Sequence, residues 1–411
     1  MNPRRPIYYG YIVVAAATLI QWISWGANRS FGVFLAPMLA DFGWTRAGIS
    51  GAFTLIWFVM GIATVFAGKL MDFIGPRLVL TVCGLLVGAG YSLTSSIHDI
   101  WQFYLTYGLI AGIGMSGCFT PLLSMIPRWF ARRRALMAGV ITAGAAFGIS
   151  VVPVLCTLLI EHLGWRLSYL TLGTGVAIVV VAAAQFLKRD PGEMGLLPYG
   201  LEETGQNTWD LQQAGLTLKQ AVRTHQFWLI CFIQFGTFFL MNVITVHIVI
   251  HAIETGIAPT PAADILSVAA GVSIFARITI GALADRMGNK PTIMTCFILS
   301  VAGYALLLQA KDLWVFYAVS FLFGFGLWSS TAIMSSITAD LFGLRQLSTI
   351  FSCTSCLGAL GGGVGPVVLG YIYDVSGTYR PGFILCIWLT VIVVAASILL
   401  RSKPDPEVHY G

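Results

Sequence analysis

The stretch LSVAAGVSIFARITIGALADRMGNK, residues 266–290, is an apolar helical segment with one arginine, Arg277, set inside it, and it ends in the glycine-rich turn GALADRMGNK. An arginine keeps its proton in a protein, so this charge remains within the apolar segment. Such a charge must face a cavity lined by protein, and by default it marks a path for a ligand or an ion. We therefore expect the rest of the chain to form a container around Arg277.

The composition is that of an integral membrane protein. Of the 411 residues, 57% are hydrophobic and 10% are charged, whereas a soluble domain has roughly 25% charged residues. The N-terminus leads straight into a full-length apolar run, so we expect no secretory signal peptide. All eight cysteines lie in apolar runs and are expected to be free thiols; Cys353 and Cys356 form a CxxC whose surroundings favour packing over a redox role.

Twelve apolar segments predict an all-α membrane protein with twelve transmembrane helices. One long polar gap, Lys188 to Arg223, divides them into six and six. We expect an N-terminal six-helix half at 1–187, a cytoplasmic linker at 188–225 and a C-terminal six-helix half at 226–411. The segments lie at about 11–36, 47–71, 77–97, 100–127, 134–160, 166–187, 226–252, 262–284, 291–310, 313–339, 346–372 and 381–401.

The two halves resemble copies of each other. Seven pairs of like residues share one offset of 213 positions, which indicates an internal duplication and is typical of a transporter whose halves rock about a central site. The pairs are Gly43 and Gly256, Gly68 and Gly281, Asp72 and Asp285, Gly75 and Gly288, Arg77 and Lys290, Pro153 and Pro366, and Gly164 and Gly377.

The distribution of Lys and Arg predicts the orientation. With both termini on one side, that side carries most of the basic residues, and the other side carries only Arg46, Arg166, Lys311 and Arg380. Because basic loops stay in the cytoplasm, we expect both termini to be cytoplasmic and the protein to be multi-pass in the inner (plasma) membrane.

The turns GKLMDFIGPR (68–77) and GALADRMGNK (281–290) resemble the signature loop of the major facilitator superfamily, in the same place in both halves. The resemblance implies the major facilitator fold with two pseudo-symmetric halves. The glycines allow tight turns, and an aspartate can cap a neighbouring helix. We interpret four residues of these turns as gating or structural rather than binding: Asp72, Arg77, Asp285 and Arg286.

Three further stretches resemble the monocarboxylate porter family within that superfamily: PRWFARRRALMAGVITAGAAFG (127–148), YYGYIVVAAA (8–17) and FGWTRAGIS (42–50), the last similar to its bacterial members. The chain is therefore identified as a bacterial member of this family. The resemblance implies alternating-access transport of a small monocarboxylate such as lactate or pyruvate, with proton symport. It implies as partners the substrate, protons and the lipid bilayer.

Arg277 has two interpretations. Its planar guanidinium can bind both oxygens of a substrate carboxylate, or it can pair with a structural acid. The acidic residues lie near the ends of the apolar segments, which favours the substrate, and monocarboxylate porters carry an arginine at this point. The animal porters place an aspartate one turn earlier, where this chain has Ser273, so the route of the proton stays open.

Asn28 and Arg29 lie towards the outer end of the first segment, because Arg29 is about 27 Å along a helix from Tyr11. Arg29 then either extends to the interface or faces the cavity; the animal porters have a lysine at the aligned position. The offset of 213 relates Arg29 to Asn242. By resemblance, spans one, four, seven and ten line the cavity, with candidates Trp25, Cys118, Phe119, Asn242, Trp328 and Thr331.

His247, His251 and Glu254 share one face of the seventh segment. A metal site is disfavoured because no further ligand is placed to help, so we expect no metal and no cofactor. The histidines either carry a proton or pack between helices. No pairing of a nucleophile with a base suggests an enzyme. Nothing in the sequence points to nucleic acid or to a partner subunit, and we expect a monomer.

Two alternative functions remain. If Arg29 and Arg277 both face the cavity, the empty carrier holds two unpaired charges and is costly to reorient, which favours an organic-anion exchanger of the oxalate/formate type. The alternative from another class is a membrane receptor or sensor that binds its ligand without transport.

Overall fold

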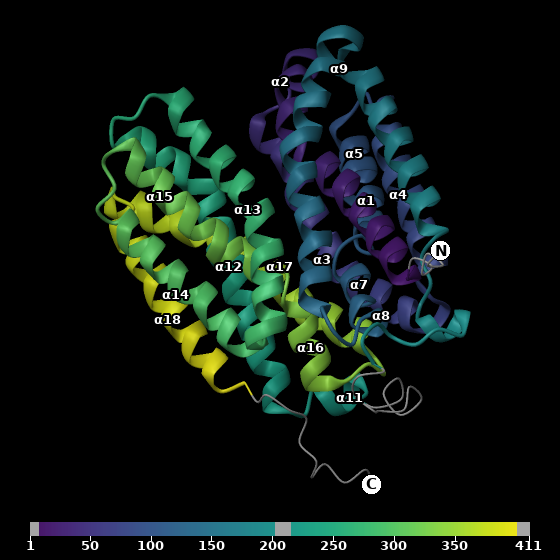
Figure 1. Cartoon of the computed structure of the whole chain (residues 1–411). Helices are drawn as coiled ribbons and strands as arrows, with labels where there is room; N and C mark the ends of the chain where they lie inside the picture. Colours follow the sequence, from purple (N-terminus) through teal and green to yellow (C-terminus); the bar gives the residue numbers. More distant parts are fainter. Residues whose placement is uncertain (1–7, 202–214, 401–411) are drawn as a thin grey trace, which may run out of the picture.

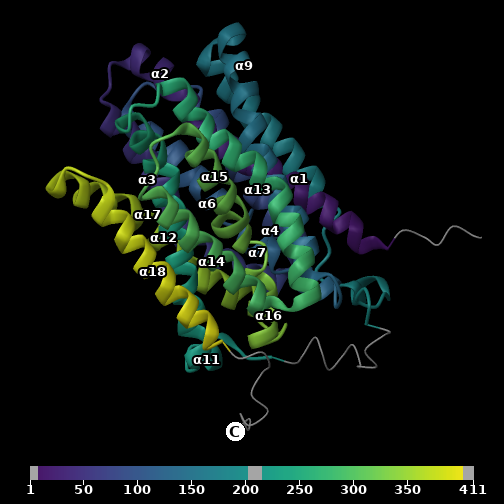
Figure 2. The ribbon, with the colours of Figure 1, turned by 60° about the vertical axis from the view of Figure 1, so that its left-hand side comes forward.

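Two bundles of helices make up the protein in this computed structural model, which describes residues 8–201 and 215–400. In Figure 1 the N-terminal half, coloured purple to teal, stands beside the C-terminal half, coloured green to yellow. The halves diverge at the top of that view and meet at its bottom. Figure 2, turned by 60°, shows the long helices of both halves inclined along roughly the same axis.

The elements follow the duplicated order that the sequence predicts. The N-terminal half contains α1 (Tyr9–Arg29), α2 (Phe31–Phe42), α3 (Arg46–Ile74), α4 (Pro76–Thr94), α5 (Ile100–Phe103), η1 (Tyr104–Ile110), α6 (Ala111–Met115), α7 (Thr120–Leu123), α8 (Ile126–Trp129) and α9 (Arg134–Ala184). A short η2 (Pro191–Met194) follows. The C-terminal half contains α11 (Leu218–Ala221), α12 (His225–Glu254), α13 (Pro259–Met287), α14 (Asn289–Leu307), α15 (Leu313–Phe323), η3 (Gly324–Trp328), α16 (Met334–Phe342), α17 (Leu347–Ser376) and α18 (Arg380–Ile398).

The described residues supply the predicted twelve membrane crossings. Ten stretches are long and apolar enough to cross a bilayer. One of them, α9, holds two crossings, because its chain turns at Gly164, where φ is 74° and ψ is 165°. The shorter apolar helix Leu313–Trp328, continued by α16, supplies the remaining crossing. The large exposed apolar side chains, such as Phe73 and Phe275, suit helices that face lipid.

The fourth and tenth crossings are broken helices. Each contains a stretch of π-helix, at Tyr104–Ile110 and at Gly324–Trp328, followed by turns. Such wide turns are frequent at functional sites and need other partners for the displaced backbone groups. These are two of the four crossings that the sequence resemblance places around the cavity.

The duplication is visible in the backbone. Gly75 and Gly288, 213 residues apart, adopt φ and ψ of 88° and 165° and of 95° and 156°, a region open to glycine and not to other residues. Each joins two crossings at the same end of the bundle. We call that end, which also holds Arg128 to Arg134, the basic end.

Reciprocal contacts of two aspartates join the halves at the basic end. Asp72 accepts hydrogen bonds from the backbone N–H and the hydroxyl of Thr349, at 2.9 and 2.8 Å, in the first turn of α17. Asp285 accepts from the N–H groups of Ala135 and Leu136, at 3.1 and 2.9 Å, in the first turn of α9. A carboxylate stabilises a helix N-terminus, so each half caps a helix of the other.

The connection between the halves pairs with the same turn in each of them. Tyr199 forms an isolated bridge with Phe130, and Gly215 forms one with Gly343. Phe130 and Gly343 are themselves related by the offset of 213. Tyr8 reinforces the first attachment by donating its hydroxyl to the carbonyl of Leu197 at 3.0 Å, and burial raises the pKa of Tyr8 to about 12.

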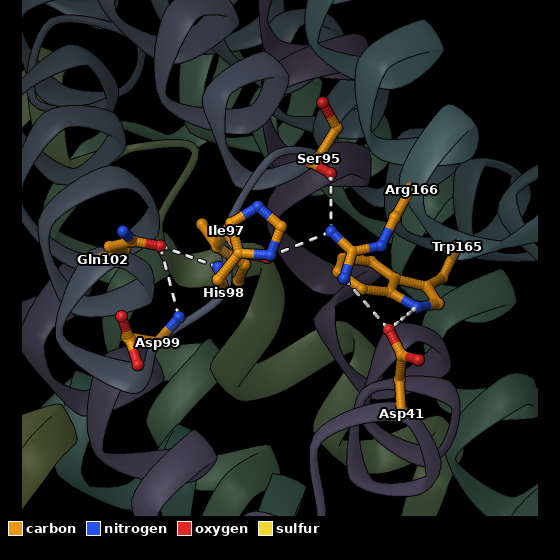
Figure 3. A network of polar contacts seen from close by, with 8 residues as sticks. All are labelled: Asp41, Ser95, Ile97, His98, Asp99, Gln102, Trp165 and Arg166. Carbon is orange, nitrogen blue, oxygen red and sulfur yellow. Dashed lines mark hydrogen bonds and ion pairs between the residues drawn. The ribbon is translucent and has the colours of Figure 1, made fainter.

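At the opposite end, Arg166 fastens three segments of the N-terminal half (Figure 3). Its Nη1 donates to the carbonyls of Ser95 and Ile97 at 3.2 and 3.0 Å, and its Nη2 contacts Asp41 at 3.1 Å. Trp165 donates to the same carboxylate at 3.3 Å. Figure 3 shows Arg166 between the α4–α5 turn and the end of α2.

Replacing Arg166 by alanine should lower stability modestly and leave the central region intact. Water can replace the lost hydrogen bonds to the two carbonyls and the carboxylate, because the Arg166 and Asp41 side chains are partly exposed. We expect a loss of about 1 kcal/mol, measured as thermal unfolding in detergent, with Arg380→Ala at the same end as the control. A normal unfolding midpoint with lost uptake would contradict this assignment.

Candidate functional site

Arg277 lies on α13 where that helix packs against α9 of the other half. Only 8% of the residue is exposed. Its Nη1 donates to the carbonyl of Thr142 at 2.6 Å, while its Nε is buried without a partner. An added Cβ at Gly139 would touch the Arg277 carbonyl oxygen, so a small residue is what lets the two backbones approach.

No carboxylate balances this charge. Among the described residues, the ion pairs are Arg128 with Asp72, Arg134 with Asp340 and Arg166 with Asp41. Arg277 therefore contributes an uncompensated buried charge at the contact between the halves, with a carbonyl as its hydrogen-bond partner. A buried cation of this kind creates a favourable place for an anion.

Ser273, one turn before Arg277, is a satisfied hydroxyl. It is buried, and its Oγ donates to the carbonyl of Ala270 at 2.8 Å. The position therefore supplies neither a counter-charge nor a titrating group to the guanidinium.

Asn28 and Arg29 are the last two residues of α1, and both side chains have a polar group without its usual partner among the described residues. The Arg29 guanidinium carbon lies over the Trp57 ring, 5.2 Å from its centroid, which is a cation–π contact. The Asn28 residue is 2% exposed, and its side-chain oxygen is buried without a partner. Arg29 likewise has no carboxylate partner among the described residues.

A pocket lies between the two halves. We call it the central pocket. Its walls come from α1, α3 and the α6–α7 region on one side and from α12 and α17 on the other. Four rings line it, those of Trp25, Trp57, Phe119 and Phe238, together with the side chains of Met60 and Met115 and the hydroxyl residues Thr64, Ser116, Thr120 and Ser355.

Some of the residues that the sequence predicted to line the cavity do line this pocket, and others do not. Trp25 and Phe119 line it, and their rings meet edge to face at 5.3 Å. The Asn242 amide instead donates to the carbonyl of Phe238 at 2.9 Å. Arg277, Arg29, Asn28, Cys118, Trp328 and Thr331 are not among the residues that line the pocket.

Sequence reasoning missed the contribution of the second and eleventh crossings to this pocket, and the residue that the seventh supplies. Trp57, Met60 and Thr64 come from α3, Phe238 from α12 and Ser355 from α17. No signal in the sequence marked them, because a single aromatic or hydroxyl residue in an apolar run looks the same whether it faces lipid, protein or a cavity.

The two histidines lie within the C-terminal half. His247 is 7% exposed; its Nε2 is 3.0 Å from the carbonyl of Pro366, and its Nδ1 is 3.2 Å from the hydroxyl of Tyr379. Because the carbonyl can only accept, Nε2 carries a proton. His251 packs its ring against Phe316, Tyr379 and Phe383, and its Nε2 has no partner. Neither histidine lines the central pocket.

The remaining turn residues contact neighbouring helices or solvent. Arg77 donates from Nε to the side-chain oxygen of Gln185 at 2.7 Å, within the N-terminal half. Arg286 is exposed. Within residues 8–201 and 215–400, no cluster of three or more His, Cys, Asp or Glu side chains is arranged to hold a metal ion.

Comparisons with known proteins agree with this architecture. A sequence model described as "Major Facilitator Superfamily" matches residues 15–253 and 230–410. The chain is 27% identical over 404 residues to monocarboxylate transporter 13 of Bos taurus, covering 96% of this chain and 89% of that protein. It is 28% identical over 417 residues to human monocarboxylate transporter 2, covering 95% and 84%. Both relatives are animal proteins, so these comparisons do not support the bacterial assignment.

Solved structures share the fold at low identity. The human organic anion transporter MFSD10 (TETRAN) superposes with a TM-score of 0.75 at 16% identity, over 96% of this chain and all of that chain. The transporter FucP, solved in the outward conformation, gives 0.76 at 14% identity, also over 96% and 100%. These relatives are transporters and not enzymes. With its duplicated helical halves and a family match over almost its full length, the chain belongs to the major facilitator superfamily, as a multi-pass membrane transporter.

Proposed function

We propose that the protein carries a small monocarboxylate, similar to lactate or pyruvate, across the membrane by alternating access. The observation that supports this most is the buried Arg277 guanidinium at the contact between the halves, with no acidic partner among the described residues and one unpartnered nitrogen. A carboxylate would neutralise the charge and accept hydrogen bonds from it. The relatives' names as monocarboxylate transporters support the same substrate class.

We assign the substrate contacts to Arg277, with Arg29, Asn28, Asn242, Phe119 and Trp328 as further contributors. Phe119 lines the central pocket, and the unpartnered oxygen of Asn28 can accept a hydrogen bond from a donor. Asp72, Arg77, Asp285 and Arg286 belong to the gating turns. In the conformation described, the aspartate contacts hold the basic end together. We expect the substrate to enter from the opposite end.

Proton symport is the coupling we propose, with His247 or His251 as the carrier. His247 can take a second proton on Nδ1, because the Tyr379 hydroxyl can turn from donor to acceptor. The same proposal includes three further points. The protein lies in an inner (plasma) membrane with cytoplasmic termini, the linker at 188–225 divides its two halves, and its origin is bacterial. These points rest on the positions of Lys and Arg and on residues 42–50.

The test is uptake of labelled L-lactate by purified protein in liposomes with an inwardly directed proton gradient. Uptake that follows the gradient supports symport. Uptake that appears after the liposomes are preloaded with an organic anion, and not with the gradient alone, supports the exchanger instead. Binding of lactate without either flux would support a receptor.

The exchanger is kept as a second candidate because Arg29 and Arg277 both lack acidic partners among the described residues. Two cations without acidic partners inside the membrane region raise the free energy of the empty carrier during reorientation. A bound anion would remove that cost. If the carrier reorients only with an anion bound, in both directions, transport becomes obligatory exchange.

A further inference from the structure

The side chains around the central pocket suit a ring rather than a three-carbon acid. Trp25 meets Phe119 edge to face at 5.3 Å and meets Trp57 at 5.7 Å with the planes tilted by 49°. Rings arranged at such angles present both edges and faces to a further ring. Met60 and Met115 beside them are adaptable side chains that make favourable contacts with aromatic edges.

The pocket is also uncharged. Among its lining residues, none is acidic or basic, and the polar groups are hydroxyls of serine and threonine. Three of these hydroxyls are already engaged. Thr64 donates to the carbonyl of Ser116 at 2.8 Å, Ser116 donates to the carbonyl of Ile113, and Ser355 accepts from the side-chain amide of Gln234 at 3.2 Å. The pocket therefore suits the apolar body of a ligand and leaves the carboxylate to the arginines.

Two features of the residues in and beside the pocket bear on how a ligand would be held. The indole N–H of Trp25 is buried without a partner, although the residue lines the pocket and is 7% exposed. A buried donor of this kind is stabilised by an acceptor such as a 2-hydroxyl or carboxylate oxygen. The Arg29 guanidinium does not line the pocket, but it lies over the ring of Trp57, which does, and brings a positive charge close to that ring.

We propose that the substrates are monocarboxylates with an aromatic body, and that the ring is seated between Trp25, Trp57 and Phe119 from one half and Phe238 from the other. This inference rests on the proposed carboxylate transport and narrows its substrate class. Because both halves contribute walls, the ring joins them across the central pocket. A methyl group, as in lactate, leaves most of this aromatic surface uncovered and gains little from it.

The matched probes are L-lactate and L-3-phenyllactate, which differ by one phenyl ring. Each would be measured by calorimetric binding to purified protein and by uptake into liposomes. Burying a phenyl ring predicts binding about ten- to a hundredfold tighter for phenyllactate than for lactate. Phe119→Leu should weaken phenyllactate binding at least about fivefold and weaken lactate binding by a clearly smaller factor. Trp388→Leu, on the exposed surface of α18, is the control and should change neither.

The outcomes separate the two proposals. Lactate and phenyllactate bound equally, or weakened equally by Phe119→Leu, would overturn the aromatic class while lactate uptake continued to support transport. Tight, Phe119-dependent binding of phenyllactate without any uptake would keep the ring site and overturn transport. If neither acid binds, both fail. Trp57→Phe, which keeps a ring beside Arg29, guards against a folding defect: it should preserve the preference for phenyllactate.

Discussion

Arg277→Gln is expected to abolish gradient-driven lactate uptake, by about thirtyfold or more. Glutamine keeps a polar side chain of moderate length and removes the charge, so the substrate carboxylate loses its buried cation. Truncating one partner of a buried charged contact costs about 2–5 kcal/mol, which corresponds to that loss. The measurement is initial uptake at several lactate concentrations by wild type and variant at matched reconstitution.

Stability separates a substrate role from a structural role for Arg277. Because the guanidinium has a carbonyl and no acid as its partner in the described structure, removing its charge should leave the unfolding midpoint unchanged or higher. Arg277→Lys should retain part of the uptake, since an ammonium keeps the charge and loses the planar fork. Arg380→Gln, at an exposed site, is the control. Wild-type uptake by Arg277→Gln, or a large loss of stability, would contradict the assignment.

Asp72→Asn is expected to cause the larger loss of stability and to loosen the basic end. Asp72 forms a 2.7 Å ion pair with Arg128, and their side chains are 10% and 7% exposed. Breaking a buried pair leaves the other charge uncompensated and costs about 3 kcal/mol or more. The same carboxylate also caps α17 across the halves, so its loss favours separation of the basic end. The first measurement is thermal unfolding in detergent.

The repeat supplies a matched control for Asp72. Asp285→Asn removes the equivalent helix cap, on α9, but breaks no ion pair among the described residues, so we expect a loss of about 1 kcal/mol. Separation of the basic end can be followed with Ser124→Cys and Ser348→Cys, because the two hydroxyl oxygens are 2.6 Å apart. Disulfide formation should slow in both aspartate variants. Equal stability of the two variants would show that the Arg128 pair contributes little.

The positions of the crossings and the repeat could be predicted from the sequence because they depend on local properties. A run of about 20 apolar residues has to cross the bilayer as a helix, whatever its neighbours are. The turns at Gly75 and Gly288 could be predicted for a similar reason, because a backbone with positive φ favours glycine wherever it occurs. The sequence predicted two crossings at 134–160 and 166–187, and the chain of α9 turns at Gly164, between them.

The candidate site was predictable only in part. Arg277 stood out because a charge in an apolar run has few explanations. The residues that line the central pocket could not be recognised in this way. Trp57 and Phe238, for example, lie 181 residues apart and both line the pocket only because one half packs on the other. The spacing of His247 and His251 told which face they share, but not that Tyr379 and Pro366 would surround that face.

The sequence by itself determined the membrane class, the duplicated halves, the turns at the basic end and the buried positive charge of Arg277. Each follows from hydrophobicity, backbone freedom or charge, which a residue carries with it. Only the tertiary structure decided which rings meet in the central pocket, that Asp72 and Asp285 cap helices of the opposite half, and that Arg29 lies over Trp57. Those contacts join residues far apart in the chain, and they depend on how two preformed bundles fit together.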